Sequence, residues 1–213
     1  MQVVFLFYEG MTALDVIGPH EILCRFPGAK TIRVAKRSGA VRTDSAGLIL
    51  NAEYGLSDVS HADVLVVPGA GAATSFRNDP DILNWIRSIH KTTKWTTSVC
   101  TGSLILGAAG ILLGLKATSH WAALERLRTW GAEPTTERVV ESGKIVTAAG
   151  VSAGIDMALM LMAKIAGPQV AQGLQLGIEY DPAPPFDVGS PKKASPTILE
   201  ALRKKMTVSF EPI

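Results

Sequence analysis

A cysteine at a predicted sharp turn is the residue of this chain best placed to do chemistry. Cys100 follows a β-prone run, residues 94–99, and precedes an apolar stretch, residues 103–110, that is typical of a buried helix. A strand that turns abruptly into a helix with a nucleophile at the corner forms a nucleophile elbow, which needs small residues two positions to either side. Ser98 and Gly102 occupy those positions. The pattern favours a nucleophilic Cys100 thiol over the alternative, a buried packing cysteine.

The same turn leads to a prediction about the charge of the thiol. The first N–H groups of a helix lack partners within the helix and attract anions. We therefore expect the N–H groups of Thr101 and Gly102 to face the sulfur and to favour its thiolate form. Thr101 is accordingly predicted to be a catalytic residue, and Gly102 to bind the substrate or an oxyanion.

Two other segments are expected to meet Cys100, because ligands of open α/β sheets bind beyond the carboxyl ends of the strands. One is the loop 9–12 with Asp15 in the helix that follows, where Asp15 is either a catalytic acid or part of a capping box with Thr12. The other is the loop 68–71, in which Gly69 and Ala70 could leave backbone N–H groups free for an oxyanion hole.

Other motifs point away from cofactor and metal chemistry. The glycines of loop 68–71 partly imitate a dinucleotide-binding loop, but Thr74 stands where the third glycine belongs, so a nicotinamide site is not expected. No sequence motif indicates a metal site. His20, His61 and His90 are interpreted as structural and Cys24 as a packing residue, whereas His120 lies twenty positions after Cys100 at the end of a short strand.

Strand and helix patterns alternate along the chain, which predicts a mostly parallel sheet with helices on both faces. The expected strands are Val3–Tyr8, Thr31–Lys36, Leu48–Asn51, Asp63–Val67, Lys94–Val99 and a hairpin of Arg138–Val140 with Lys144–Ala148. The expected helices are Thr12–Phe26, a helix capped by Asn78 or Asp79 and running to about His90, Ser103–Gly110, Trp121–Trp130, Ser152–Ala166, Pro168–Glu179 and a last helix capped by Ser195.

Composition limits the classes of protein that the chain can belong to. Its 213 residues are 47% hydrophobic with a formal net charge of +2. We expect a single domain over residues 1–213, without a membrane span because the longest apolar stretches fall short of about 20 residues. Dispersed charges argue against nucleic-acid binding. Two cysteines without paired spacing suit a reducing cytoplasm.

Several segments together resemble one family. They are Leu14–Glu21, Val67–Gly69, Ser98–Ser103, Ala117–Trp121, Gly150–Asp156 and the proline-rich Glu179–Phe186. With these motifs the chain is similar to the ThiJ/PfpI superfamily, related to class I glutamine amidotransferases, and in particular to its isocyanide hydratase branch. The likeness spans nearly the full length, and the proline-rich segment is its most discriminating part.

The resemblance implies a flavodoxin-like three-layer sandwich, a homodimer and no cofactor. It also implies a nucleophilic Cys100 with Asp15 as its acidic partner, and a histidine, His120, near the nucleophile. Thr101 stands where the peptidase-like branch has a histidine, so a protease is not expected, and Ala70 replaces a glycine. The implied reaction is hydration of an isocyanide to an N-substituted formamide through a thioimidate on Cys100.

Two other functions remain open at this stage. Glyoxalases and deglycases use the same elbow but pair the cysteine with a glutamate, where this chain has the shorter Asp15. The sensor halves of AraC-type transcription regulators share similar elbow sequences, but they need a DNA-binding domain for which the 213 residues leave too little room. A stand-alone ligand or redox sensor would need no such domain.

Overall fold

The computed structural model describes residues 1–45, 47–71 and 79–209. Of residues 207–209 it describes the backbone alone. Its centre is a seven-stranded sheet with the order β10-β11-β7-β6-β1-β2-β5. All neighbouring strands are parallel except β10 and β11, which form an antiparallel hairpin. The strands are β1 (Gln2–Leu6), β2 (Lys30–Ala35), β5 (Tyr54–Gly55), β6 (Val64–Val67), β7 (Trp95–Val99), β10 (Val139–Ser142) and β11 (Ile145–Ala148).

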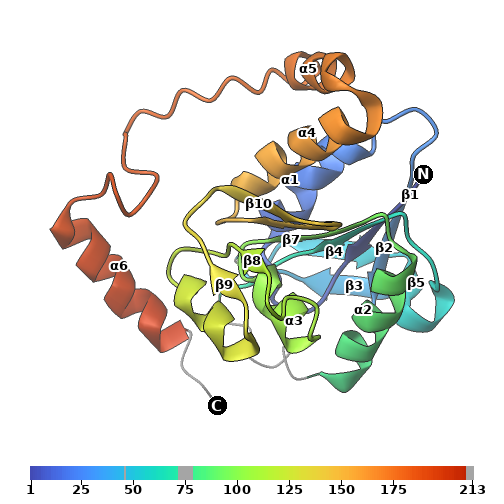
Figure 1. Cartoon of the computed structure of the whole chain (residues 1–213), viewed down its shortest axis with the longest axis horizontal. Coiled ribbons are helices and arrows are strands. Elements are labelled where there is room, and N and C mark those ends of the chain that lie inside the picture. The colour runs from blue at the N-terminus through green and yellow to red at the C-terminus, as the bar shows by residue number, and fades with distance from the viewer. Residues whose placement is uncertain (46, 72–78, 210–213) are drawn as a thin grey trace.

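Helices cover both faces of the sheet, as the alternating pattern predicts. Figure 1 shows α1 (Ala13–Leu23), α4 (Ala153–Ala166) and α5 (Pro168–Gly177) together on one side, and α2 (Pro80–Thr92) and α3 (Gly102–Ala108) on the other. Small residues bring α1 and α4 close together, since a Cβ on Gly18 would lie 2.9 Å from Ile155 and one on Gly154 would lie 3.1 Å from Pro19. The predicted three-layer α/β class is confirmed.

The predicted strands and helices are present, with small differences at their ends. Asp79 caps α2 by accepting a hydrogen bond from the Asp81 N–H at 3.0 Å, while the other predicted cap, Asn78, lies outside the described residues. The strand predicted at 48–51 is β4 (Ile49–Ala52), but it pairs with an unpredicted β3 (Gly39–Arg42) in a separate hairpin. Three further elements are too short to be predicted from a periodic sequence pattern. They are β8 (Lys116–Ala117), β9 (Glu133–Pro134) and the 3-10 turn η1 (Leu56–Asp58).

The helix predicted at 121–130 is present, but it begins three residues later and is a 3-10 helix. The structure has a 3-10 helix, η3 (Leu124–Trp130), with hydrogen bonds three residues apart around its start, such as Arg126 N–H to Ala123 O at 3.1 Å. Buried Leu124 and Leu127 and half-buried Trp130 are spaced by three, which places them on one face of a helix with three residues per turn.

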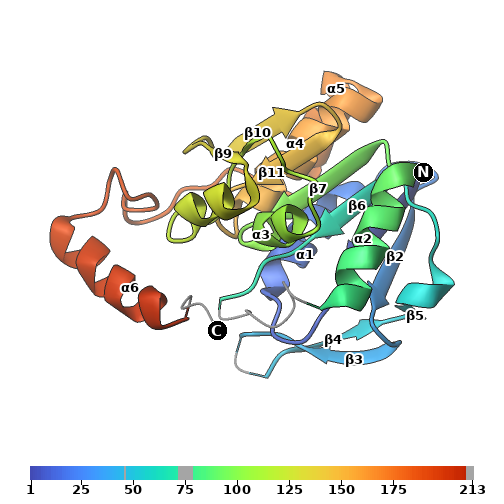
Figure 2. The same cartoon turned by 60° about the horizontal axis from the view of Figure 1, so that its bottom comes forward.

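The C-terminal part of the chain leaves the sandwich. After α5, residues 178–195 run along the molecule to α6 (Pro196–Ser209), which is apart from the sheet in both views (Figures 1 and 2). Ser195 caps α6 as predicted, since its Oγ accepts from the Ile198 N–H at 3.4 Å. Among the described helices, none has the length and apolarity needed to cross a membrane.

The sheet order places the loops that matter. β1 lies between β2, which follows it through α1, and β6, which follows later in the chain. Chain connections therefore diverge between β1 and β6, and open α/β sheets bind ligands at the carboxyl ends of strands beside such a point. Gly69 lies in the loop after β6, Cys100 in the turn after β7, and Asp15 in the first turn of α1, which follows β1.

Candidate active site

Cys100 forms the corner between β7 and α3, as the elbow pattern predicts. Its φ of 58° lies in the left-handed region, which is costly for a residue with a side chain. Its N–H donates to the carbonyls of Ala148 and Ala149 at 3.1 and 2.9 Å, and its own carbonyl accepts from the hydroxyls of Ser103 and Ser119 at 3.2 and 3.1 Å. These backbone contacts hold the strained turn in place.

Two glycines allow the loop after β6 to press against the elbow. A Cβ on Gly102 would lie 2.2 Å from the Val67 carbonyl oxygen, and one on Gly69 would lie 2.4 Å from the Thr101 nitrogen. Real Cβ atoms do not approach backbone atoms so closely. The elbow rule that requires a small residue at 102 is therefore met by direct backbone packing.

Asp15 is fully buried beside the elbow and does not cap its helix. Its Oδ2 accepts a hydrogen bond from the Gly69 N–H at 2.8 Å, across 54 residues of sequence. Thr12, the first residue before α1, makes no side-chain cap and donates its hydroxyl to Asp44 at 2.5 Å. The capping alternative for Asp15 is therefore not what the structure contains.

Asp15 and Cys100 form a coupled acid pair. Burial raises the pKa of Asp15 from 3.8 to about 7, against the lowering effects of the Gly69 N–H and of a contact with the Cys100 thiol. Oδ1 of Asp15 is buried without a conventional hydrogen-bond partner. A carboxyl group with this pKa and an unengaged oxygen can accept a proton and return it near neutral pH.

The prediction of a thiolate favoured by the helix N-terminus is wrong for this structure. Burial, helped by the negative charge of Asp15, raises the pKa of Cys100 to about 12. The N–H groups of Val151 and Thr101 face the sulfur and lower its pKa, but their effect is the smaller one. Cys100 is only 5% exposed, and desolvation of a charge at such a site outweighs two N–H dipoles.

The loop after β6 does not offer the free N–H groups that were expected of it. The Gly69 N–H is engaged by Asp15, and the Ala70 N–H donates to the Thr101 hydroxyl at 2.8 Å. That hydroxyl donates in turn to the Ala70 carbonyl at 2.9 Å. In this structure Gly69 holds the acid and Thr101 locks the loop onto the elbow.

His120 lies near the elbow without touching its sulfur. Its Nδ1 accepts from the Ala122 N–H at 3.3 Å, its ring carbon Cδ2 lies against Gly150, and burial lowers its pKa. Among the described contacts, no hydrogen bond joins His120 to Cys100 or Asp15. Burial thus favours the uncharged form of the ring, which lines the cavity next to the elbow.

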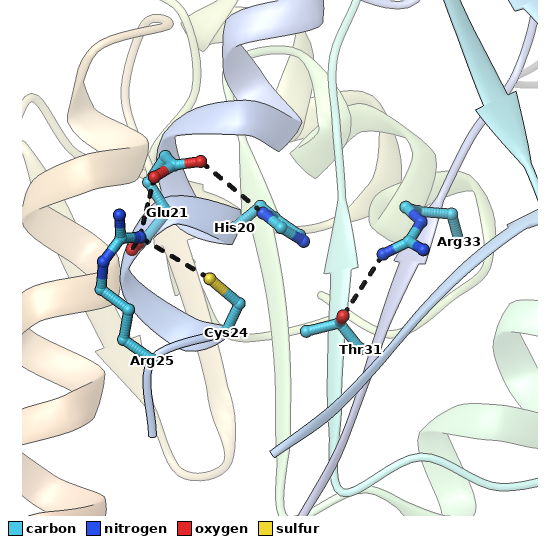
Figure 3. A network of polar contacts seen from close by, with 6 residues as sticks. All are labelled: His20, Glu21, Cys24, Arg25, Thr31 and Arg33. Carbon is cyan, nitrogen blue, oxygen red and sulfur yellow. Dashed lines mark hydrogen bonds and ion pairs between the residues drawn. The ribbon is translucent and has the colours of Figure 1, made fainter. Parts of the chain in front are cut away.

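The other histidines and the second cysteine lie away from the elbow. His20 stacks against Phe5 with ring centroids 5.3 Å apart, and His90 Nδ1 lies 2.8 Å from the Thr96 hydroxyl. Figure 3 shows Cys24 at the end of α1, where the Arg25 guanidinium lies between the sulfur, at 3.7 Å, and Glu21. Both cysteines are free thiols.

Sequence reasoning missed two contributors to the site. Asp44 accepts hydrogen bonds from Thr12 and from the Gly71 N–H, and its charge helps to raise the pKa of Asp15. Val151, at φ 28°, directs its N–H toward the Cys100 sulfur. Val151 lies in a recognised family segment, whereas nothing around Asp44 signals its role. Thr74, which takes the place of the third glycine of a dinucleotide-binding loop, lies outside the described residues.

No group of three or more His, Cys, Asp or Glu side chains within residues 1–45, 47–71 and 79–209 is arranged to hold a metal ion. The site is thus described by a thiol, a carboxyl group and backbone hydrogen bonds.

Comparisons with known proteins identify relatives of the whole chain. The chain is 41% identical over 211 residues to the isonitrile hydratase of Pseudomonas putida, which covers 99% of this chain and 92% of that protein. The crystal structure of a ThiJ/PfpI family protein from Pseudomonas syringae matches with a TM-score of 0.94 and 39% identity, over 98% of this chain and 88% of the other.

A more distant structure shares the fold alone. Drosophila melanogaster DJ-1beta matches with a TM-score of 0.73 and 20% identity, over 84% of this chain and 97% of that one. The family model for the DJ-1/PfpI family matches residues 1–164, which include Asp15, Gly69 and Cys100. This chain, a full-length homologue of isonitrile hydratase, belongs to the DJ-1/PfpI family.

Proposed function

We propose that the protein hydrates isocyanides, also called isonitriles, to N-substituted formamides, with Cys100 as nucleophile and Asp15 as general acid and base. The observation that carries the proposal is the buried pair itself. A thiol at a strained elbow lies beside a carboxyl group whose pKa is raised to about 7 and whose Oδ1 lacks a conventional partner. The homology to an isonitrile hydratase over 99% of the chain supports the reaction class.

The first step joins sulfur to carbon and moves one proton. The terminal carbon of an isocyanide is electrophilic toward sulfur, but the raised pKa of Cys100 keeps its proton in place at neutral pH. Asp15 in its carboxylate form takes this proton as the S–C bond forms, and then passes it to the same carbon. The product is a thioimidate, R–N=CH–S, attached to Cys100, and Asp15 is a carboxylate again.

The second step adds water and releases the thiol. Asp15 takes a proton from water as the oxygen attacks the thioimidate carbon, and passes this proton to the nitrogen. The S–C bond of the tetrahedral adduct then breaks while Asp15 carries the proton of the adduct's hydroxyl to the sulfur, so that the formamide leaves and Cys100 is a thiol again. The sum of the steps is one isocyanide and one water consumed for one formamide formed.

The alternatives have less support. A Cys-His protease dyad is missing, because Thr101 occupies the residue after the nucleophile and no hydrogen bond between described residues links His120 to Cys100. A glyoxalase or deglycase site would have a glutamate as the acid. A ligand or redox sensor needs no acid with a pKa near 7 beside its thiol, so the Asp15–Cys100 pair favours catalysis over sensing. The free thiols suit a reducing compartment, and we propose the cytoplasm.

The test is an assay of purified protein with phenyl isocyanide, in which N-phenylformamide is measured by chromatography. Cys100→Ser is expected to abolish formamide production while the far-ultraviolet circular dichroism stays unchanged. Cys24→Ser is the matched control, since Cys24 lies at the far end of α1, and it should keep the activity. Turnover of methylglyoxal without turnover of the isocyanide would instead show that the protein is a glyoxalase.

A further inference from the structure

A cavity of about 490 Å³ opens beside the elbow. The residues that line it include Leu14, Ser119, Gly150 and Val151, together with Arg138 and residues 189–192 of the segment before α6. Cys100 and Asp15 do not line it. The cavity thus lies next to the reacting pair, and residues 189–192 form part of its wall.

Three of the residues that line the cavity adjoin Cys100 or Asp15. The N–H of Val151 faces the Cys100 sulfur, and the Ser119 hydroxyl binds the Cys100 carbonyl at 3.1 Å. Leu14 precedes Asp15 in α1. A molecule in this cavity can therefore place one end against the elbow while its other end lies near residues 189–192.

The wall of the cavity combines apolar side chains with two cationic ones. Leu14, Trp121 and Leu124 provide the apolar surface. Among the residues that line the cavity, the charged ones are Arg138 and Lys192, and no acid is among them. A ligand that fits this wall has an apolar body and an anionic end.

The two cations differ in how far they are neutralised. Arg138 forms an ion pair through Nε with Asp156, and Nη2 of Arg138 donates to the Ser152 hydroxyl at 3.2 Å. Asp156 also accepts a hydrogen bond from the Tyr180 hydroxyl at 3.0 Å. Lys192, by contrast, makes no ion pair with any residue in the described part of the chain. The neighbouring Lys193 is paired with Asp187 and does not line the cavity. Lys192 is thus the charge that remains for a ligand.

We propose that the physiological substrate is an isocyano carboxylic acid, whose carboxylate pairs with Lys192 while its apolar body rests against Trp121, Leu124 and Leu14. This inference rests on the proposed isocyanide hydration and names the substrate class for it. Arg138, held by Asp156, adds to the positive potential at the same end. The ammonium group of Lys192 is a specificity determinant and takes no part in the bond-forming steps.

The experiment compares two substrates that differ in one charge, 4-isocyanobenzoate and its methyl ester. Steady-state kcat/KM is measured for both with the unchanged protein, with Lys192→Gln and with the matched control Lys193→Gln. The unchanged protein should prefer the acid. Lys192→Gln should lower the acid-to-ester ratio of kcat/KM about tenfold, through KM, because a charge-assisted contact at an exposed rim is lost. Lys193→Gln should keep the ratio, and Lys192→Glu should reverse the preference.

The outcomes separate this inference from the proposed function. If the unchanged protein hydrates acid and ester with equal kcat/KM, or if both lysine variants change the ratio equally, the substrate class is wrong and the hydration stands. If it hydrates neither compound nor phenyl isocyanide, the proposed function itself fails. Higher ionic strength should reduce kcat/KM for the acid and leave that for the ester, and equal reductions would contradict a charged contact.

Discussion

At the scale of residues, the site depends on a proton shared between two buried groups. With the pKa of Asp15 raised to about 7 and that of Cys100 to about 12, the pair carries a single proton between these two pH values. Where that proton resides matters less than the total, because a thiol with a carboxylate and a thiolate with a carboxylic acid are the same protonation state of a coupled pair. This total sets the pH range in which the proposed reaction can begin.

The first prediction is therefore an acidic limb in the pH profile. Below pH about 7 the pair gains a second proton, and no carboxylate remains to accept the proton of the thiol. We expect kcat/KM for phenyl isocyanide to fall about tenfold per pH unit below this value and to stay level toward pH 9. A profile that rises between pH 7 and 9 instead would mean that the titrating group is the thiol.

The second prediction separates the chemistry of Asp15 from its effect on stability. Asp15→Asn keeps an acceptor for the Gly69 N–H but cannot transfer a proton, so turnover should fall about a hundredfold or more. In the unchanged protein the folded pKa of Asp15 is raised, so the folded state binds its proton more tightly than the unfolded state. The contribution of Asp15 to the free energy of unfolding is therefore largest below pH about 4 and declines as the pH rises to about 7.

Thermal midpoints check the second part of that prediction. The midpoint of Asp15→Asn relative to the unchanged protein should increase between pH 4 and 7, because the variant has no buried carboxylate to form. A relative midpoint that is constant across this range would show that the pKa of Asp15 is not raised in the folded protein, and the assigned acid would be lost.

At the scale of elements, the site depends on how closely the β6 loop packs on the elbow. We predict that Gly102→Ala destabilises the protein by about 3 kcal/mol or prevents folding, since its Cβ would overlap the Val67 carbonyl oxygen at 2.2 Å and backbone must move. Gly173→Ala is the control: Gly173 lies in α5 with open space around it, and alanine there should stabilise by about 0.5–1 kcal/mol. Urea unfolding measures both, and equal stabilities would contradict the packing.

At the scale of the whole molecule, α6 has no sheet to cover. This fourteen-residue helix stands apart from the sandwich and leaves Ile198 and Leu202 45% and 41% exposed, although isolated helices of this length are marginal in water. We propose that it packs on a second copy in a homodimer. Sedimentation should give twice the mass of one chain, and Leu202→Asp should shift the protein toward monomer while Lys204→Asp does not. A monomeric unchanged protein would rule this out.

The sequence by itself determined the order of elements and the position of the cysteine elbow. The small residues around Cys100 and the alternation of strands and helices are local patterns, which can be recognised in a sequence without knowledge of its tertiary contacts. The elbow, the parallel sheet and the β10–β11 hairpin could all be predicted for that reason.

Only the tertiary structure decided how those residues behave. Thr12 and Asp15 match a capping box in the sequence, yet Asp15 turns to Gly69, a partner 54 residues away that the β6 loop brings to it. The thiol was expected to be acidic because of its helix, yet burial and the charge of Asp15 raise its pKa to about 12. Burial and long-range pairing depend on the packed layers together, so the charges of this site are a property of the fold rather than of its motifs.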